Sequence, residues 1–174
     1  MNFENTALIM IDLQAFTKRL AKNVAPHSFD EVIENNKKLI TAFEVANRPI
    51  YFVTVEPKFL PKKWREAFGR LELADIFANT ANAHKLVKSG PSAFTKSDYG
   101  LETELKSFGI TELYITGIST SNGVYKTAVD GAKSGFDVVL VEDAATAPKA
   151  AAHEKIINLE FPKIGKVVKT ADIL

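Results

Sequence analysis

The most constraining feature of this sequence is residues 113–130, where a short apolar run gives way to small polar residues and then to helical spacing. The run up to Thr116 suits a buried strand, and Gly117 interrupts it. Ser119 to Asn122 are residue types that favour helix starts, because their side-chain oxygens accept hydrogen bonds from unpaired amides. A strand, a polar turn and a helix in this order can aim backbone N–H groups at a ligand, although an ordinary strand-to-helix turn fits the same pattern. We call residues 117–124 the elbow.

Strand and helix patterns alternate along the rest of the chain. The expected strands are residues 6–12, 50–54, 84–88, a run from about 112, 137–141 and 166–169. The expected helices are residues 28–46, a short one around 64–68, one from Ser97 or Asp98 to 107, the elbow helix to about 133, and 150–159. This alternation predicts an α/β fold with a six-stranded, mostly parallel sheet and helices on both faces. A length of 174 residues suits one domain, so we expect residues 1–174 to form a single domain.

Composition and charge exclude several classes of function. The 22 basic and 21 acidic residues nearly cancel, which gives no reason to expect a nucleic-acid or anionic-membrane partner. No apolar run is long enough to span a bilayer, and Asp12 interrupts the first one, which argues against a signal peptide. We therefore expect a cytoplasmic protein with a small-molecule substrate. The chain has no cysteine, which excludes disulfides, thiolate zinc sites and a cysteine nucleophile.

Two charged residues stand where strands are expected to end. Asp12 ends the first expected strand, and Lys88 ends the third. In parallel sheets, ligands bind beyond the carboxyl ends of the strands, where the elbow also lies. Alone, Asp12 is as easily a cap for the next turn, and Lys88 would by default be solvated. If both face one crevice, burial raises the pKa of the carboxyl group and the ammonium lowers it, and the pair can then donate or accept a proton.

Four segments carry a resemblance that covers nearly the whole chain. They are Ala7–Gln14, Lys88–Phe94, the elbow with Thr127 and Ala128 after it, and Val138–Ala144. In these segments the chain resembles the isochorismatase-like hydrolase superfamily, which also includes nicotinamidases and N-carbamoylsarcosine amidases. The resemblance implies a three-layer αβα, Rossmann-like domain in which Asp12 and Lys88 share a pocket with the elbow. It also implies a cis peptide at Ile118–Ser119, an anion hole of elbow amides, and a homo-oligomer, either a dimer or a tetramer.

The chain departs from the amidases of this superfamily at two places. Their Asp–Lys–Cys triad would need a cysteine at the position of Gly123, and glycine offers no nucleophile. The Asp-x-His-x-His metal motif of nicotinamidases is absent after the second expected strand. The histidines, His27, His84 and His153, are scattered in the sequence. We therefore expect no metal and no cofactor, and we reject both the cysteine amidase and the metal-dependent nicotinamidase.

Glycine at this elbow position resembles the true isochorismatases, which hydrolyse a vinyl ether, release pyruvate and form no covalent intermediate. The resemblance gives Asp12 the role of general acid. Lys88 would hold the substrate or steady Asp12, and the amides of Asn122 and Gly123 would receive a carboxylate or a developing oxyanion. Gly123 would leave room for water or a wider substrate.

The remaining substrate-binding candidates are less constrained by the sequence. Gln14 is expected to order the first loop by hydrogen bonds, and His153 to lie on the surface of its helix. Side chains that could line the pocket are Phe16, Trp64, Phe94, Tyr99, Ser119, Thr120 and Tyr125.

Two alternatives to this hydrolase stay open. The first is a catalytically silent protein that binds a small molecule, which the missing nucleophile and Ala15–Phe16, in place of the superfamily's Asn-Asp, would explain. The second places the nucleophile on Ser119, Thr120 or Ser121, but no histidine lies nearby in the sequence to activate a hydroxyl group.

Overall fold

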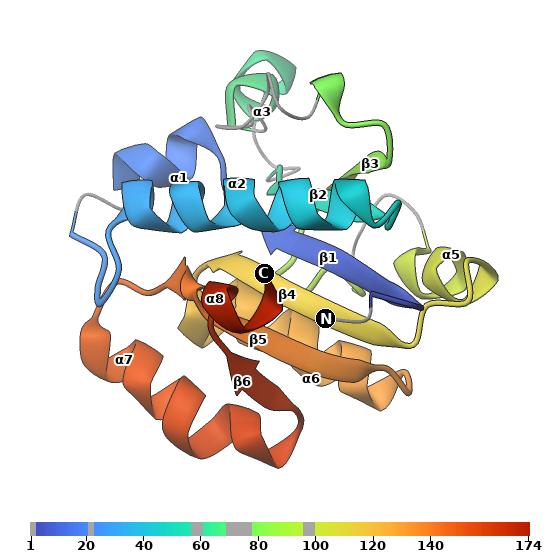
Figure 1. The fold of residues 1–174 in the computed structure, drawn as a ribbon. Helices are drawn as coiled ribbons and strands as arrows, with labels where there is room; N and C mark the ends of the chain where they lie inside the picture. Colours follow the sequence, from blue (N-terminus) through green and yellow to red (C-terminus); the bar gives the residue numbers. More distant parts are fainter. Residues whose placement is uncertain (1–2, 21–22, 57–60, 69–77, 96–99) are drawn as a thin grey trace.

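The computed structural model describes residues 3–20, 23–56, 61–68, 78–95 and 100–174 (Figure 1). Its centre is a six-stranded parallel sheet with the strand order β3-β2-β1-β4-β5-β6. The strands are β1 (Thr6–Ile11), β2 (Ile50–Val55), β3 (Ala83–Lys88), β4 (Glu112–Ile118), β5 (Asp137–Thr146) and β6 (Lys166–Val168). The predicted α/β class, with a parallel sheet and helices on both faces, is confirmed.

The described residues also form helices and turns, several of which pack on the two faces of the sheet. They are α1 (Ala15–Leu20), α2 (Phe29–Val45), α3 (Lys62–Phe68), α5 (Leu101–Ser107), the π-helical turn η1 (Thr120–Val124), α6 (Tyr125–Lys133), α7 (Ala150–Lys155), the π-helical turn η2 (Ile156–Glu160), the 3-10 turn η3 (Phe161–Lys163) and α8 (Thr170–Ile173). Helices α2 and α8 cover the face toward the viewer in Figure 1, and α6 lies behind the sheet. Within the described ranges, no helix combines the length and the apolar character that crossing a bilayer requires.

Strand β1 shows why the sheet strands are continuous apolar runs rather than alternating ones. Ala7, Ile9 and Ile11 pack into the core with α5 and α6. Leu8 and Met10 point the other way, into the core with α2 and α8. Because both faces are covered, every residue of β1 is buried, as the sequence pattern predicts.

Helix α2 begins as predicted at Ser28. The Ser28 hydroxyl accepts a hydrogen bond from the Glu31 amide, and the Glu31 carboxylate accepts one from the Ser28 amide. This reciprocal pair satisfies two amides that a helix start leaves unpaired.

Other boundaries differ from the prediction. Strand β5 continues to Thr146, because after a register shift between Ile115 and Gly117 its Ala145 and Thr146 pair again with β4. The short helices α1 and α8 were not predicted, and the helix expected to reach residue 159 changes to a π-helical turn at Ile156. The expected helix start at Ser97 or Asp98 lies outside the described residues.

The strand order makes the boundary between β1 and β4 a topological switch point. The chain leaves β1 toward β2 and leaves β4 toward β5, so the connections part on opposite sides of these neighbouring strands. Such switch points are where open α/β sheets bind ligands. Asp12 follows β1 directly and the elbow spans the end of β4, so both reach the same point.

Gly117 makes the close approach of these two strands possible. It pairs with Ile11 and has a φ of 106°, a conformation that side-chain-bearing residues rarely adopt. A Cβ at this position would overlap the backbone carbonyl and nitrogen of Ile11.

We expect Gly117→Ala to lower the free energy of unfolding by more than about 4 kcal/mol, because backbone strain and a backbone clash combine. Gly135→Ala is the matched control, since Gly135 also has a positive φ of 91° but open space around its Cβ position. It should cost about 1–2 kcal/mol. Urea unfolding measures both, and equal losses would show that the contact with Ile11 is unimportant.

Candidate active site

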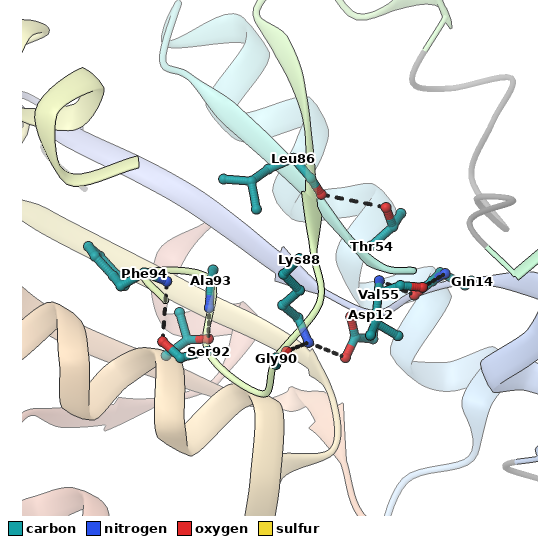
Figure 2. Close-up of polar contacts among 11 residues, drawn as sticks. Asp12, Gln14, Thr54, Val55, Leu86, Lys88, Gly90, Ser92, Ala93 and Phe94 are labelled. Atoms are coloured by element: carbon teal, nitrogen blue, oxygen red, sulfur yellow. Dashed lines mark hydrogen bonds and ion pairs between the residues drawn. The ribbon is translucent and has the colours of Figure 1, made fainter. Parts of the chain in front are cut away.

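The site is built around an ion pair between Asp12 and Lys88 (Figure 2). Strand β2 lies between β1 and β3, so it is the long side chain of Lys88 that carries its ammonium group to Asp12. The Lys88 Nζ donates to Asp12 Oδ2 at 2.8 Å and to the carbonyl oxygen of Gly90 at 3.3 Å. The structure thus brings together two residues that lie 76 positions apart in the sequence.

Burial dominates the electrostatics of the pair. The side chains of Lys88 and Asp12 are 2% and 13% exposed. Burial raises the pKa of Asp12 to about 6, while the charge and the hydrogen bond of Lys88 act to lower it. Asp12 Oδ1 is also buried, and it has no hydrogen-bond partner among the described residues. The Asp12 carboxyl group can therefore both donate and accept a proton at a pH close to 6.

Gly123 of the elbow lies directly beside this carboxyl group. A Cβ added at Gly123 would lie 3.4 Å from Asp12 Oδ2, 3.5 Å from the Pro91 carbonyl oxygen and 3.0 Å from Ile11 Cγ2. A side chain at position 123 would therefore contact the Asp12 carboxyl group. Because glycine has no side chain, this space is free for a ligand. The structure has a cis peptide at Ile118–Ser119, as the resemblance implied.

The elbow amides are not all available as the sequence suggested. The Asn122 amide donates to the Ser119 carbonyl oxygen at 2.9 Å, and the Val124 amide donates to the same oxygen at 3.2 Å. The expectation that the Asn122 amide receives a substrate oxygen is therefore wrong for this conformation. In the π-helical turn, the Asn122 N–H points toward the elbow's own backbone.

Hydrogen bonds from neighbouring segments hold the loops of the site. The Gln14 side chain is fully buried, donates to the Val55 carbonyl oxygen at 3.2 Å and accepts from the Val55 amide at 2.8 Å (Figure 2). It orders the loop after β1, as expected. The Thr127 hydroxyl accepts from the Ala93 amide at 3.1 Å, which ties the loop after Lys88 to α6.

The predicted pocket residues occupy varied surroundings. Phe94 packs against Phe136 on the core side of α6, with 5.9 Å between ring centroids. Trp64 on α3 is 65% exposed. Tyr125 lines a surface hollow of about 380 Å³ between α6 and the loop at Pro91.

The other candidates lie on α1 and the elbow, apart from Tyr99, which lies outside the described residues. Phe16 is half-buried on α1. Ser119 is half-buried, with its Oγ 3.1 Å from the Oγ of Ser121, and Asn122 is exposed.

His153 does not lie on the surface of its helix, so that prediction is wrong. Its side chain is fully buried, and its Nδ1 lies 2.9 Å from the Oγ1 of Thr120, the first residue of η1. Its ring is 5.7 Å from that of His27, so these two histidines are not scattered in space. In the described part of the chain, no third His, Asp or Glu joins them to complete a metal site. The available signal was helical spacing, because His153 shares its helix face with the buried Ile156.

The structure is thus an α/β protein with a parallel sheet and a buried, protonatable carboxyl group at its switch point. Residues 6–172 match the isochorismatase domain, so the chain belongs to the isochorismatase family, whose members are hydrolases. It is 31% identical to the uncharacterised isochorismatase family protein YecD of Escherichia coli O157:H7, over 192 residues that cover 100% of this chain and 97% of YecD.

Two further comparisons agree with this family. Enterobactin synthase component B of Escherichia coli K12 is 27% identical over 183 residues, which cover 98% of this chain and 63% of that protein. The structure of an isochorismatase family protein from Burkholderia thailandensis matches with a TM-score of 0.84 and 27% identity, covering 99% of this chain and 94% of that one.

We expect the Asp12 carboxyl group to titrate near pH 6 and to titrate at higher pH in Lys88→Met. The variant keeps the burial that raises the pKa and removes the ammonium that lowers it. Carbon-13 NMR of the carboxyl group measures both values. A wild-type pKa near 4, or a lower value in Lys88→Met, would contradict this description of the site.

Proposed function

We propose that this protein hydrolyses a small carboxylated metabolite that carries a vinyl ether of the isochorismate type. Asp12 acts as general acid and base, and no covalent intermediate forms. The observation that supports this most is the carboxyl group itself, whose pKa is raised to about 6 although an ammonium group lies 2.8 Å away. An acid with a pKa near the working pH suits proton transfer to a reacting carbon.

The reaction follows from the residues of the site. The protonated Asp12 gives its proton to the terminal carbon of the enol ether, which leaves a cation stabilised by the ether oxygen. Lys88 stabilises the carboxylate that this step creates. Water adds to the cation and loses a proton to Asp12, which restores the acid. In the resulting hemiketal, the bond between the hemiketal carbon and the ether oxygen breaks. The proton of the new hydroxyl group passes to the departing ring oxygen, so the products are pyruvate and the ring alcohol.

Gly123 suits this chemistry because the reaction needs no nucleophilic side chain. The place of a side chain at position 123 lies within van der Waals distance of Asp12 Oδ2, so a bare glycine leaves that oxygen open to the substrate. In this proposal, the Gly123 amide and the Ser119 and Asn122 side chains hold the substrate carboxylate. Phe16, Trp64 and Tyr125 are further candidates for its ring.

We expect Asp12→Asn and Asp12→Ala to lower pyruvate release from isochorismate by about 10³-fold, the usual range for a lost general acid. The wild-type rate should fall as pH rises above about 6, because the required protonated form is then depleted. Asp30→Asn is the control, since Asp30 is an exposed carboxylate paired with Lys18. Coupled detection of pyruvate measures the rates, and circular dichroism checks the fold.

Two outcomes would contradict the proposal in different ways. An Asp12→Ala protein as active as wild type would remove Asp12 from the mechanism. Ligands that raise the melting temperature of the wild type without being consumed, together with no turnover of isochorismate, would favour the silent binding protein.

A further inference from the structure

We propose that His153 is a positioning residue. Through its hydrogen bond to Thr120 it holds the first turn of the elbow, and thereby the place of Gly123 against Asp12. This inference rests on the proposed function in one respect, namely that the elbow forms a wall of the active site.

The contact between Thr120 and His153 joins two elements that are 33 positions apart in the sequence. Thr120 and His153 are both fully buried, and their Oγ1 and Nδ1 atoms are 2.9 Å apart. Helix α7, which carries His153, packs against η1. Because both groups are shielded from water, this hydrogen bond has no solvent competitor.

Burying the imidazole ring of His153 costs free energy, because one of its two ring nitrogens has no hydrogen-bond partner in the described part of the chain. His153 Nε2 is buried and has no hydrogen-bond partner within the described residues. Burial lowers the pKa of His153 to about 4, so the ring is neutral at ordinary pH. An apolar side chain would fill the same space without an unpaired nitrogen, which leaves Nδ1 as the useful atom.

Backbone hydrogen bonds transmit the position of Thr120 to Gly123. The Thr120 carbonyl oxygen accepts from the Tyr125 amide, and the Ser119 carbonyl oxygen accepts from the Asn122 and Val124 amides. Gly123 lies within this single turn, so a shift of Thr120 moves the whole turn relative to Asp12.

A role for Thr120 as a nucleophile activated by His153 fits the geometry less well. The Thr120 side chain is fully buried, so its hydroxyl group has no surface on which to meet a substrate. A histidine is therefore present beside Thr120, although the sequence showed none nearby. In this proposal it holds the elbow in place and does not activate the Thr120 hydroxyl group.

The absence of cysteine from the chain allows a reporter that needs no turnover. Gly123→Cys introduces one thiol beside Asp12 and needs only a small adjustment of Ile11 Cγ2. Its rate of alkylation by iodoacetamide depends on its access and on the nearby Lys88 and Asp12 charges. We expect His153→Leu and Thr120→Val in this background to slow alkylation about tenfold, and the double variant to be no slower than either single one.

His153→Asn is the matched rescue, since asparagine has nearly the shape of leucine but keeps a polar atom near the Nδ1 position. It should alkylate within about twofold of its parent. Thr6→Val is the structural control, because the buried Thr6 hydroxyl donates to the Phe3 carbonyl oxygen at the opposite end of β1. It should lower the melting temperature and leave alkylation unchanged.

The second readout is the pKa of Asp12, measured by carbon-13 NMR in His153→Leu and His153→Asn proteins that keep Gly123. It tests the positioning role of His153 even if the thiol reacts too slowly for alkylation rates to be compared. We expect this pKa to shift in the leucine variant only. Equal alkylation rates and equal Asp12 titrations in the two variants would overturn the positioning role. Neither readout needs hydrolysis, so failure of the proposed reaction would leave this test intact.

Discussion

The buried pair of Asp12 and Lys88 is the constraint on which the site depends. Removing a carboxyl group and an ammonium group from water costs several kcal/mol per ion, and their mutual attraction offsets this only when the geometry is good. A contact of 2.8 Å between residues at the ends of β1 and β3 offsets part of this cost, but burial outweighs it, since the pKa of Asp12 is raised to about 6. Because β2 lies between these strands, the pair links the end of β1 to the end of β3 across β2. The same contact holds these two strand ends together and lowers a pKa that burial raises.

The sheet brings the elbow to this pair through backbone packing rather than through side chains. Gly117 lets β4 approach β1 so closely that no side chain fits between them. The turn that follows is held by Thr120 and His153 on one side, and Thr127 holds the loop after Lys88 on the other. Each of these contacts uses a small polar residue whose local role is structural. Together they leave an acid beside an unsubstituted glycine.

Much of the fold was predictable from sequence because both faces of the sheet are covered, which makes strands such as β1 and β2 nearly continuous apolar runs. The positions of Asp12 and Lys88 at strand ends followed from the expected strands, but spacing alone could not show that the two meet. Other features depend on hydrogen bonds that leave no periodic pattern. The Asn122 amide is taken up by the π-helical turn, and the last residues of β5 pair with β4 only after a register shift. His153 was misplaced because a polar side chain suggested a surface, whereas its spacing from Ile156 indicated a buried face.

The direction of the Asp12 pKa shift bears on whether the pair is catalytic or merely structural. A structural ion pair stabilises the fold when its carboxylate is held charged, and its pKa then lies below the usual value. Here burial outweighs the ammonium and raises the pKa to about 6, so the charged form is the strained one in the folded protein. As pH rises from about 4 to 6, the unfolded chain loses this proton first, and the carboxyl group contributes less to stability. A carboxyl group that is more easily protonated in the folded chain, next to a position without a side chain, is what the proposed proton transfer requires.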